Sequence, residues 1–269
     1  MKRVILLDAD VPAYRFASRG QKEIAWDEGE EVVKVAPPED WAIDNMLQYI
    51  NDLKEELDAQ RLVMCFSDAV RSNNWRLDVL STYKFNRDPG SRPVLHDAME
   101  AALSEHFEFF RKDTLEGDDV LGILATNNKI IKGHKIIVSI DKDLKTIPSR
   151  PQQGSDNTLV HVPKVGAGIE VVVTESDADW YWMYQTIIGD STDGYKGCKG
   201  AGPVKAYQVL GEKGDGRTIE HYWPLVVELY ESKDQTEADA LKQAQVARIA
   251  RAEDFNYKTK RVIPWLPKF

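Results

Sequence analysis

The chain has 269 residues, of which 42% are hydrophobic, so it can bury a full core and form one large domain or two small ones. Its formal net charge of −9 argues against a polyanionic partner by its sum alone, although metal ions bound among clustered carboxylates would offset part of this charge. The N-terminal segment lacks a signal-peptide pattern, no apolar run is long enough to cross a bilayer, and the two cysteines have no metal-ligand spacing, so we expect a cytoplasmic protein without a disulfide framework.

Short apolar runs alternate with amphipathic segments over the first half of the chain. The predicted strands are residues 4–8, 61–68 and 134–141, each ending in aspartate. The predicted helices are residues 38–57, 94–106 and 118–131, and the first of them has apolar residues at helical spacing behind an acidic first turn. Strands separated by helices imply parallel crossovers, and therefore an α/β fold with a mostly parallel central sheet flanked by helices.

The second half of the chain begins with a loop rich in proline, serine, glutamine and glycine at residues 148–157. Further predicted elements are strands at 158–162 and 169–173, helices at 176–188 and 236–252, and at most a short strand in 261–269. The aromatic residues of the helix at 176–188 are expected to fill a core rather than to stack on bases. Arg248 and Arg251 lie one helical step apart and could contact either a duplex or nearby acids.

Acidic residues follow each of the three early strands. Asp8 and Asp10 follow the first strand, Asp68 the second, and Asp141 and Asp143 the third. In an open α/β sheet, ligands bind outside the carboxyl ends of the strands. A single acidic pair there is as readily a loop or helix N-terminus, but acids at three strand ends favour a metal site, because clustered like charges need cations or protons to offset them.

A fourth acidic segment, LEGDDVLGILAT, adds Glu116, Asp118 and Asp119 at the start of a predicted helix. These acids could simply complement the helix dipole, but Glu116 and Asp119 are three residues apart and would share a face that offers two oxygens to one cation. With Asp190 and Asp193, the carboxylates are too many for one Mg²⁺ and suit two. Two magnesium ions suit in-line displacement at a phosphodiester. The sequence has neither the cysteine and histidine clusters of a zinc site nor the GxxxxGK(S/T) loop that binds nucleoside triphosphates.

The segment QTIIGDSTDGYKGCKGAGPVKAYQVL, residues 185–210, combines acids with a loop rich in glycine and lysine. The glycines allow a tight hairpin between two helices, with Pro203 well placed at the start of the second. Main-chain amides and lysines there could bind phosphates of a DNA backbone without reading bases. The residues expected to do so are Lys196, Gly197, Lys199, Gly200, Gly202 and Lys205.

The acids in LLDAD, FSDA, LEGDD, SIDKD and GDSTD, in this order and followed by the glycine-rich hairpin, resemble those of the flap endonuclease and 5′ nuclease superfamily. The likeness is greatest to the 5′-to-3′ exonucleases of podoviruses, and it extends over almost the whole chain. Further segments similar to that subgroup are YKFNRD, DKDLKTIP, QAQVARIARAEDFN and IPWLP. The resemblance implies a PIN-like 5′ nuclease fold with a C-terminal helix-three-turn-helix region that binds DNA.

The resemblance also assigns roles to individual residues. It implies that one metal region is surrounded by Asp8, Asp68, Glu116, Asp118 and Asp119, and a second by Asp141, Asp143, Asp190 and Asp193, some of them through water; Asp10 is a less certain member. The implied catalytic residues are Lys84, Arg87, Asp118 and Asp141, with Lys84 and Arg87 on the scissile phosphate and Tyr83 stacked on a terminal base. The implied cofactors are two Mg²⁺ ions, for which Mn²⁺ can substitute, and a K⁺ ion on main-chain carbonyls of the hairpin.

The resemblance implies a metal-binding nuclease core at residues 1–188 and a hairpin region at 189–269, packed as one compact unit. Within the core, the arch of flap nucleases corresponds to residues 84–113, which are few and hold one clear helix. We therefore expect a monomeric Mg²⁺-dependent 5′-to-3′ exodeoxyribonuclease of phage DNA replication or recombination. It would act on duplex DNA at recessed, nicked or blunt 5′ ends.

Other functions remain open on the sequence alone. A haloacid dehalogenase-like phosphatase would use Asp8 as nucleophile and Asp10 as general acid, because LLDADVP also matches that motif. The main activity could instead be cleavage of 5′ flaps, or the chain could be a non-catalytic DNA-binding scaffold, although such a scaffold has no use for so many acids. Hydrolysis of RNA in RNA·DNA hybrids also stays possible, since a grip on phosphates does not sense the 2′-hydroxyl.

Overall fold

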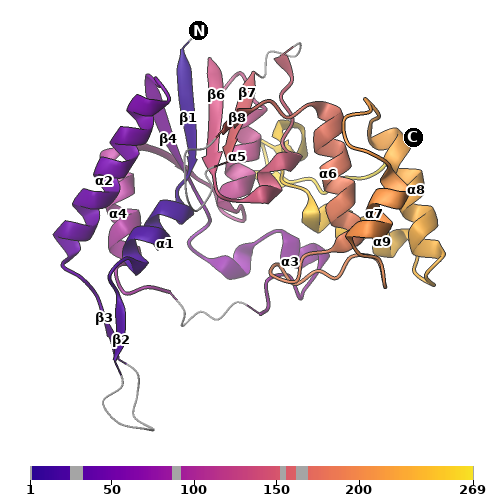
Figure 1. Cartoon of the computed structure of the whole chain (residues 1–269), viewed down its shortest axis with the longest axis horizontal. Helices are drawn as coiled ribbons and strands as arrows, with labels where there is room; N and C mark the ends of the chain where they lie inside the picture. Colours follow the sequence, from indigo (N-terminus) through magenta and orange to yellow (C-terminus); the bar gives the residue numbers. More distant parts are fainter. Residues whose placement is uncertain (1, 25–32, 87–91, 152–155, 162–168, 269) are drawn as a thin grey trace.

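The computed structural model describes residues 2–24, 33–86, 92–151, 156–161 and 169–268. A central sheet with helices on both faces forms one part of the molecule, and a group of four helices lies beside it (Figure 1). The predicted α/β class with a mostly parallel sheet is confirmed. Within the described residues, no helix is both long and apolar enough to span a membrane.

The six-stranded sheet has the order β5-β4-β1-β6-β7-β8. All neighbouring strands are parallel except β7 and β8, which pair antiparallel. The bounds are β1 Arg3–Asp8, β4 Arg61–Phe66, β5 Glu108–Arg111, β6 His134–Ser139, β7 Asn157–His161 and β8 Ile169–Val171. The central strands β1, β4 and β6 are apolar on both faces, as expected for parallel strands covered on two sides. Their carboxyl ends therefore meet at one edge of the sheet.

Two hydrophobic clusters cover the two faces of the sheet. On one face, Ile5 and Leu7 of β1 pack with α1 (Asp10–Ser18), α2 (Glu39–Glu56) and α4 (His96–His106). On the other face, Val4 and Leu6 pack with α5 (Gly117–Ala125) and with the chain after residue 248. Alternate residues of one strand thus serve the two faces, as the pleat requires.

The C-terminal segment approaches α5 very closely at Gly122. A Cβ atom on this glycine would lie 2.4 Å from the carbonyl oxygen of Ala250 and 2.8 Å from Cγ2 of Ile249. Any other residue would push the two segments apart. Glycine is therefore required here, because the backbone of the C-terminal segment lies directly against α5. The same helix is capped by Glu116 and contains Asp118.

The remaining helices form a third cluster beside the sheet. These helices are α6 Glu175–Ile188, α7 Pro203–Leu210, α8 Ile219–Glu231 and α9 Glu237–Ala247. Trp180 and Trp182 are buried in this cluster, and Nε1 of Trp182 donates to the carbonyl oxygen of Ala244 at 2.8 Å, so the prediction that these rings fill a core is confirmed. Because α6 packs on α7, α8 and α9, this cluster includes residues on both sides of the predicted boundary at 188, which stays a prediction.

Several elements differ from the expectations. Helix α5 ends at Ala125 rather than residue 131, and α9 ends at Ala247 rather than residue 252. Helices α1 and α8 are not among the predicted elements; Pro12 lies in the first turn of α1, where a proline costs a helix little, whereas Pro224 lies inside α8. The other described elements are β2 Lys22–Ile24, β3 Val33–Val35, η1 Arg71–Asn73, α3 Arg76–Val79, η3 Lys142–Thr146, η5 Ala252–Asp254, β9 Phe255–Asn256 and β10 Arg261–Val262.

Candidate active site

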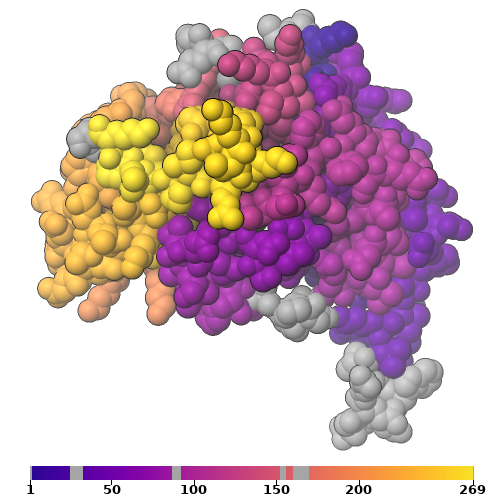
Figure 2. Space-filling view, turned by 180° about the vertical axis from the view of Figure 1, so that it is seen from behind, coloured from indigo at the N-terminus to yellow at the C-terminus, as the bar shows by residue number. Residues whose placement is uncertain are grey.

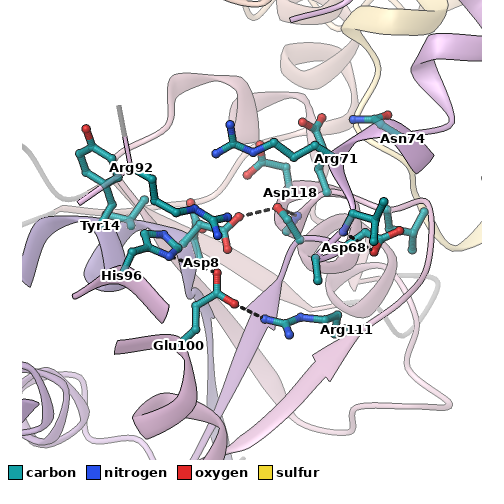
Figure 3. A pocket seen from close by; sticks show the side chains of 18 of the residues that line it. Asp8, Tyr14, Asp68, Arg71, Asn74, Arg92, His96, Glu100, Arg111 and Asp118 are labelled. Atoms are coloured by element: carbon teal, nitrogen blue, oxygen red, sulfur yellow. Dashed lines mark hydrogen bonds and ion pairs between the residues drawn. The ribbon is translucent and has the colours of Figure 1, made fainter. Parts of the chain in front are cut away.

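A cavity of about 1290 Å³ opens at the carboxyl ends of β1, β4 and β6, beside the start of α5. Figure 3 shows Asp68 and Asp118 on one side of it, His96 and Glu100 on another, and Asp8 between them. Its acidic lining residues are Asp8, Asp10, Asp68, Asp97, Glu100, Glu116, Asp118 and Asp141. The strand-end rule thus places the first predicted metal group around one cavity, with the exception of Asp119.

Asp8, Asp118 and Asp141 form the most crowded part of this lining. Burial, followed by the charges of Asp10 and Asp141, raises the pKa of Asp8 to about 7, although Ser139 Oγ donates to its Oδ2 at 2.9 Å. Burial and the charges of Asp8 and Asp141 likewise raise the pKa of Asp118 well above its ordinary value. A cation placed among these carboxylates would relieve this repulsion.

The second predicted group gathers around Asp143. Its amide donates to Oδ1 of Asp141 at 2.8 Å at the start of η3, and Gln185 Nε2 donates to its Oδ1 at 2.6 Å. Burial, then the charge of Asp141 and those of Asp193 and Asp190, raises the pKa of Asp143 to about 7. The acids of η3 and of the loop after α6 are therefore close enough to repel one another.

The donor chemistry fits hard divalent cations, although the ligands are not preorganised. Across the described part of the chain, no three carboxylate, histidine or cysteine side chains form a ready-made set for a metal ion. The cavity nevertheless offers mainly carboxylate oxygens, which Mg²⁺ and Mn²⁺ prefer over softer ligands. The raised pKa values of Asp8, Asp118 and Asp143 are an independent sign that charge compensation is missing there.

Glu116 caps α5 and is held as a carboxylate by three donors. Tyr83 Oη donates to its Oε2 at 2.9 Å, Arg76 Nη1 lies 3.1 Å from the same oxygen, and Lys84 Nζ pairs with Oε1. Burial acts to raise the pKa of Glu116, but the charges of Lys84 and Arg76 outweigh it and lower the pKa to about 2. Glu116 is therefore ionised at neutral pH.

Asp119 does not line the cavity. It is fully buried and accepts two hydrogen bonds from Arg76, at 2.7 and 2.8 Å, one from Trp75 Nε1 at 2.9 Å and one from the amide of Ala250 at 2.9 Å. The expectation that Glu116 and Asp119 share a face toward one cation is therefore wrong. Their spacing instead serves a capping box, in which Asp119 also accepts from the amide of Glu116.

Asp68 lines the cavity but is largely engaged by its own loop. Its carboxylate accepts from the amides of Val70 at 3.0 Å and Thr114 at 2.8 Å, and from Asn73 Nδ2 at 3.3 Å. Burial acts to raise the pKa of Asp68, but these hydrogen bonds outweigh it and lower the pKa. With its lone pairs partly occupied, Asp68 suits a water-mediated contact with a metal ion better than a direct one.

The segment after α3 places Lys84 at the cavity and buries Tyr83. The amide of Lys84 donates to the carbonyl oxygen of Asp193 at 2.8 Å, which fixes this loop against the acidic loop after α6. Tyr83 is 5% exposed and its hydroxyl also contacts Oδ2 of Asp193 at 3.2 Å, so the predicted stacking of Tyr83 on a terminal base is wrong. Phe85, which the sequence did not single out, is 73% exposed. Arg87 lies outside the described residues.

Part of the glycine-rich hairpin is packed rather than open. Gly197 has a φ of 67°, and a Cβ on it would lie 2.4 Å from the amide nitrogen of Gly189. Its own amide donates to Gln243 Oε1 at 2.8 Å, and the amide of Lys199 donates to Gln235 Oε1 at 2.7 Å. These two amides hold the hairpin to the neighbouring helices, so the expected phosphate contact through Gly197 is wrong.

The other end of the hairpin is exposed. Gly200 and Gly202 have open space where a side chain would lie, and Gly202 precedes the first turn of α7, with Pro203 at its start as predicted. The side chains of Lys196, Lys199 and Lys205 are exposed around it. This end of α7 can therefore admit a phosphate, whereas the Gly197 turn cannot.

Two further arginines are structural. Arg248 and Arg251 are 7% and 2% exposed, which rules out the alternative in which they contact a duplex. Arg248 Nε donates to Asp254 at 2.8 Å, and Arg251 Nη2 donates to the carbonyl oxygen of Thr146 at 2.9 Å. Their partners lie in elements that helical spacing alone does not bring together.

The raised pKa of Asp8 makes the stability of the metal-free protein depend on pH. Because the folded pKa, about 7, lies above the unfolded value, 3.8, this group's contribution is fully present below about pH 4 and is lost as the pH rises toward 7. We expect Asp8→Asn to gain stability over the wild type by about 2 kcal/mol between pH 4 and pH 8, measured by urea unfolding in EDTA. Asp58→Asn, an exposed acid, is the control, and a constant difference for Asp8→Asn would contradict the assignment.

Comparison with known proteins bears on this site. Residues 3–153 match the family described as 5′-3′ exonuclease, N-terminal resolvase-like domain. An exodeoxyribonuclease of Enterobacteria phage T3 is 30% identical over 99% of this chain and 94% of its own length, and an exonuclease of Escherichia phage T7 is 29% identical over the same shares. A structure of the phage T5 flap endonuclease, in a pseudo-enzyme-product complex with DNA and metal ions, has a TM-score of 0.60 at 16% identity and covers 91% of this chain and 89% of that one.

Fold, cavity and relatives together define a nuclease, a hydrolase of phosphodiesters. The chain belongs to the 5′-to-3′ exonuclease family, and the predicted membership of the 5′ nuclease superfamily is confirmed. Membership of this family argues against the two alternatives, a haloacid dehalogenase-like phosphatase and a non-catalytic scaffold. The phage relatives are matched over nearly their full length, so the likeness includes the C-terminal helices as well as the sheet.

Proposed function

We propose that the protein is a Mg²⁺-dependent exodeoxyribonuclease that degrades duplex DNA from 5′ ends through two metal ions. The observation that carries this proposal is the crowding of Asp8, Asp118 and Asp141, whose mutual repulsion only protons or cations can offset, beside the ammonium group of Lys84. Two metal ions bound side by side would suit the in-line displacement at a phosphodiester.

The residues divide between two metal positions. One would be held by Asp8, Asp118 and Glu116, with Asp68 acting through water; the other would be held by Asp141, Asp143, Asp190 and Asp193. When bound, the ions supply an activated water and charge stabilisation for the leaving 3′-oxygen. Mn²⁺, which accepts the same oxygen ligands, should substitute.

Lys84 supports the phosphate. In the metal-free protein its ammonium pairs with Glu116 and lies 3.6 Å from Oδ2 of Asp193, at the mouth between the two acidic groups. A scissile phosphate entering there brings negative charge to which Lys84 can turn, while Tyr83 and Arg76 continue to hold Glu116. Arg87, three residues further on, is proposed to assist.

The open end of the hairpin would grip the duplex. Amides at the start of α7, together with Lys196, Lys199 and Lys205, can bind backbone phosphates without reading bases, which suits an enzyme that must advance along any sequence. We also propose a K⁺ ion on main-chain carbonyls of this hairpin. The distance from the hairpin to the acids would set which phosphate is cut.

Duplex ends are the proposed substrate. In the region that corresponds to the arch of flap nucleases, the described residues 92–113 form α4 and β5, and α4 packs on α1 and α2. This supports a preference for recessed, nicked or blunt 5′ ends over long flaps, with flap cleavage and hydrolysis of RNA·DNA hybrids as lesser activities. A monomer in the host cytoplasm, acting in phage replication or recombination, completes the proposal.

The deciding experiment follows purified protein on internally labelled blunt, nicked and 5′-flapped duplexes with Mg²⁺, Mn²⁺ or EDTA, with products resolved by length. Metal-dependent release of mononucleotides or short oligonucleotides from 5′ ends is expected. Faster cutting of long flaps would make flap endonuclease the main activity. Absence of cleavage on every substrate would overturn the proposed function.

The hairpin lysines should control affinity rather than chemistry. We expect the double variant Lys199→Ala/Lys205→Ala to weaken duplex binding about tenfold in EDTA at low salt, and to reduce the slope of log affinity against log salt by about 2, because each phosphate contact releases a counterion. Salt titrations by fluorescence anisotropy measure both quantities. The matched control is Lys2→Ala/Lys132→Ala, a pair of exposed lysines at the opposite end of the parallel strands. Equal slopes for the two double variants would argue against this surface.

A further inference from the structure

Arg76 is the most completely engaged cation in the described part of the active-site region. It is 2% exposed, and all five of its N–H groups donate. Two bonds form a fork on Asp119, at 2.7 and 2.8 Å, and a third reaches Oε2 of Glu116 at 3.1 Å. The last two go to the carbonyl oxygens of Val246 at 2.9 Å and Arg248 at 2.8 Å.

These contacts join segments that are far apart in the sequence. Arg76 begins α3, its carboxylate partners lie at the start of α5, and its carbonyl partners lie at the end of α9 and just after it. In the view from behind, C-terminal residues coloured yellow lie against residues coloured purple, between orange atoms on one side and magenta atoms on the other (Figure 2). The amide of Ala250 adds its own bond to Asp119, so the C-terminal segment touches this carboxylate directly as well as through Arg76.

The geometry leaves the guanidinium a single orientation. Trp75 packs its ring 4.5 Å from the guanidinium carbon and donates to Oδ2 of Asp119, so Arg76 is held from its face as well as along its edge. A planar fork with every donor used cannot rotate without leaving a buried polar group unpaired, which is unfavourable. Its position is therefore determined by α5 and the C-terminal segment together.

This orientation decides which oxygen of Glu116 faces the cavity. Arg76 and Tyr83 both bind Oε2, while Oε1 is directed to Lys84. Arg76 donates two hydrogen bonds to Asp119 and only one to Glu116. The carboxylate of Glu116 thus presents Oε1, paired with Lys84, on the side of the cavity.

We propose that Arg76, oriented by Asp119 and by the carbonyl groups of Val246 and Arg248, is a positioning residue that holds Glu116 for a divalent cation. The C-terminal segment therefore helps to orient a metal ligand, in addition to packing against the sheet. The inference rests on the proposed metal-dependent function. Partners that orient a metal ligand change metal affinity by about 10 to 100-fold when they are removed.

The chain supplies a matched control for this role. Arg150 also forms a fork on a carboxylate, with Nε and Nη2 donating to Glu175, the latter at 2.6 Å, and its Nη1 donates to Oε1 of Glu253 at 2.9 Å, yet neither acid lines the cavity and neither contacts Arg76. Arg76→Lys and Arg150→Lys each keep a cation and lose the planar fork. Both should lower the melting temperature.

The test compares Mn²⁺ binding by calorimetry in the wild type, Arg76→Lys and Arg150→Lys, well below each melting temperature. We expect Arg76→Lys to weaken Mn²⁺ binding about tenfold and to shift the Mg²⁺ dependence of cleavage to higher concentration, with affinity for duplex DNA in EDTA unchanged. Arg150→Lys should bind Mn²⁺ as the wild type does. Unchanged Mn²⁺ binding in Arg76→Lys, or an equal loss in both variants, overturns the inference.

A substitute variant and a measurement without DNA make the result interpretable. If Arg76→Lys lacks a cooperative unfolding transition, Asp119→Asn replaces it, because this change leaves the guanidinium in place but removes its bidentate partner; unchanged Mn²⁺ binding in that variant overturns the inference equally. Calorimetry requires no DNA. Failure of the wild type to cut any DNA would therefore sink the proposed function, whereas failure of this inference would appear only in the comparison of metal affinities.

Discussion

Asp118→Ala should lower the rate of DNA cleavage by about 10³-fold, and Asp141→Ala should do the same, with duplex binding in EDTA unchanged within about twofold. Asp118 is crowded by the charges of Asp8 and Asp141 at the cavity, and losing a metal ligand would remove several kcal/mol of transition-state stabilisation. Single-turnover cleavage of a labelled duplex measures the first effect, and anisotropy measures the second.

The control for these variants is Asp97→Ala. Asp97 also lines the cavity, but it lies on α4, pairs with Arg92 at 3.1 Å and has an 85% exposed side chain. Its removal should leave the cleavage rate within about twofold, because an exposed ion pair contributes little. Retained turnover in both Asp118→Ala and Asp141→Ala would contradict the assignment of these acids to metal ions.

Lys84→Ala should reduce kcat by about 10² to 10³-fold while leaving KM nearly unchanged, as expected when a charge acts mainly on the transition state. The ammonium is held between Glu116 and Asp193, where a scissile phosphate would meet both metal groups. Steady-state rates at several duplex concentrations separate the two constants.

Lys112→Ala provides the comparison, because Lys112 is exposed just after β5 and does not line the cavity. It should behave as the wild type. If Lys84→Ala instead raised KM with kcat unchanged, Lys84 would be a binding residue only, and the charge that stabilises the transition state would have to come from elsewhere in the site.

The carboxylates of the site could be found from the sequence because their placement follows from local pattern. Buried strands are recognised by apolar runs, and parallel strands bring their carboxyl ends to one edge, so the sequence alone predicts that Asp8, Asp68 and Asp141 converge. Proline before a helical run likewise placed the start of α7 at Pro203. These inferences use only neighbours in the chain.

What a given acid or aromatic ring does was decided by partners from distant segments. Asp119 and Glu116 share a helix turn, but Asp119 is buried by hydrogen bonds from Arg76 and from the amide of Ala250, which lies 131 residues after Asp119. Tyr83 has the sequence context of a stacking residue, but Asp193, 110 residues away, and Glu116 bind its hydroxyl and bury its ring.

The sequence by itself determined which strands are followed by acids, the class of fold and the family. Each of these depends on periodicity and on short motifs read in order. Tertiary structure alone decided which carboxylates line the cavity and which amides of the hairpin are already hydrogen-bonded within the protein. Gly197 shows the reason. Its amide donates to Gln243 of α9 and is therefore not available to bind a phosphate. A polar group is available to a ligand only when no other segment of the chain satisfies it, and that competition is settled by packing.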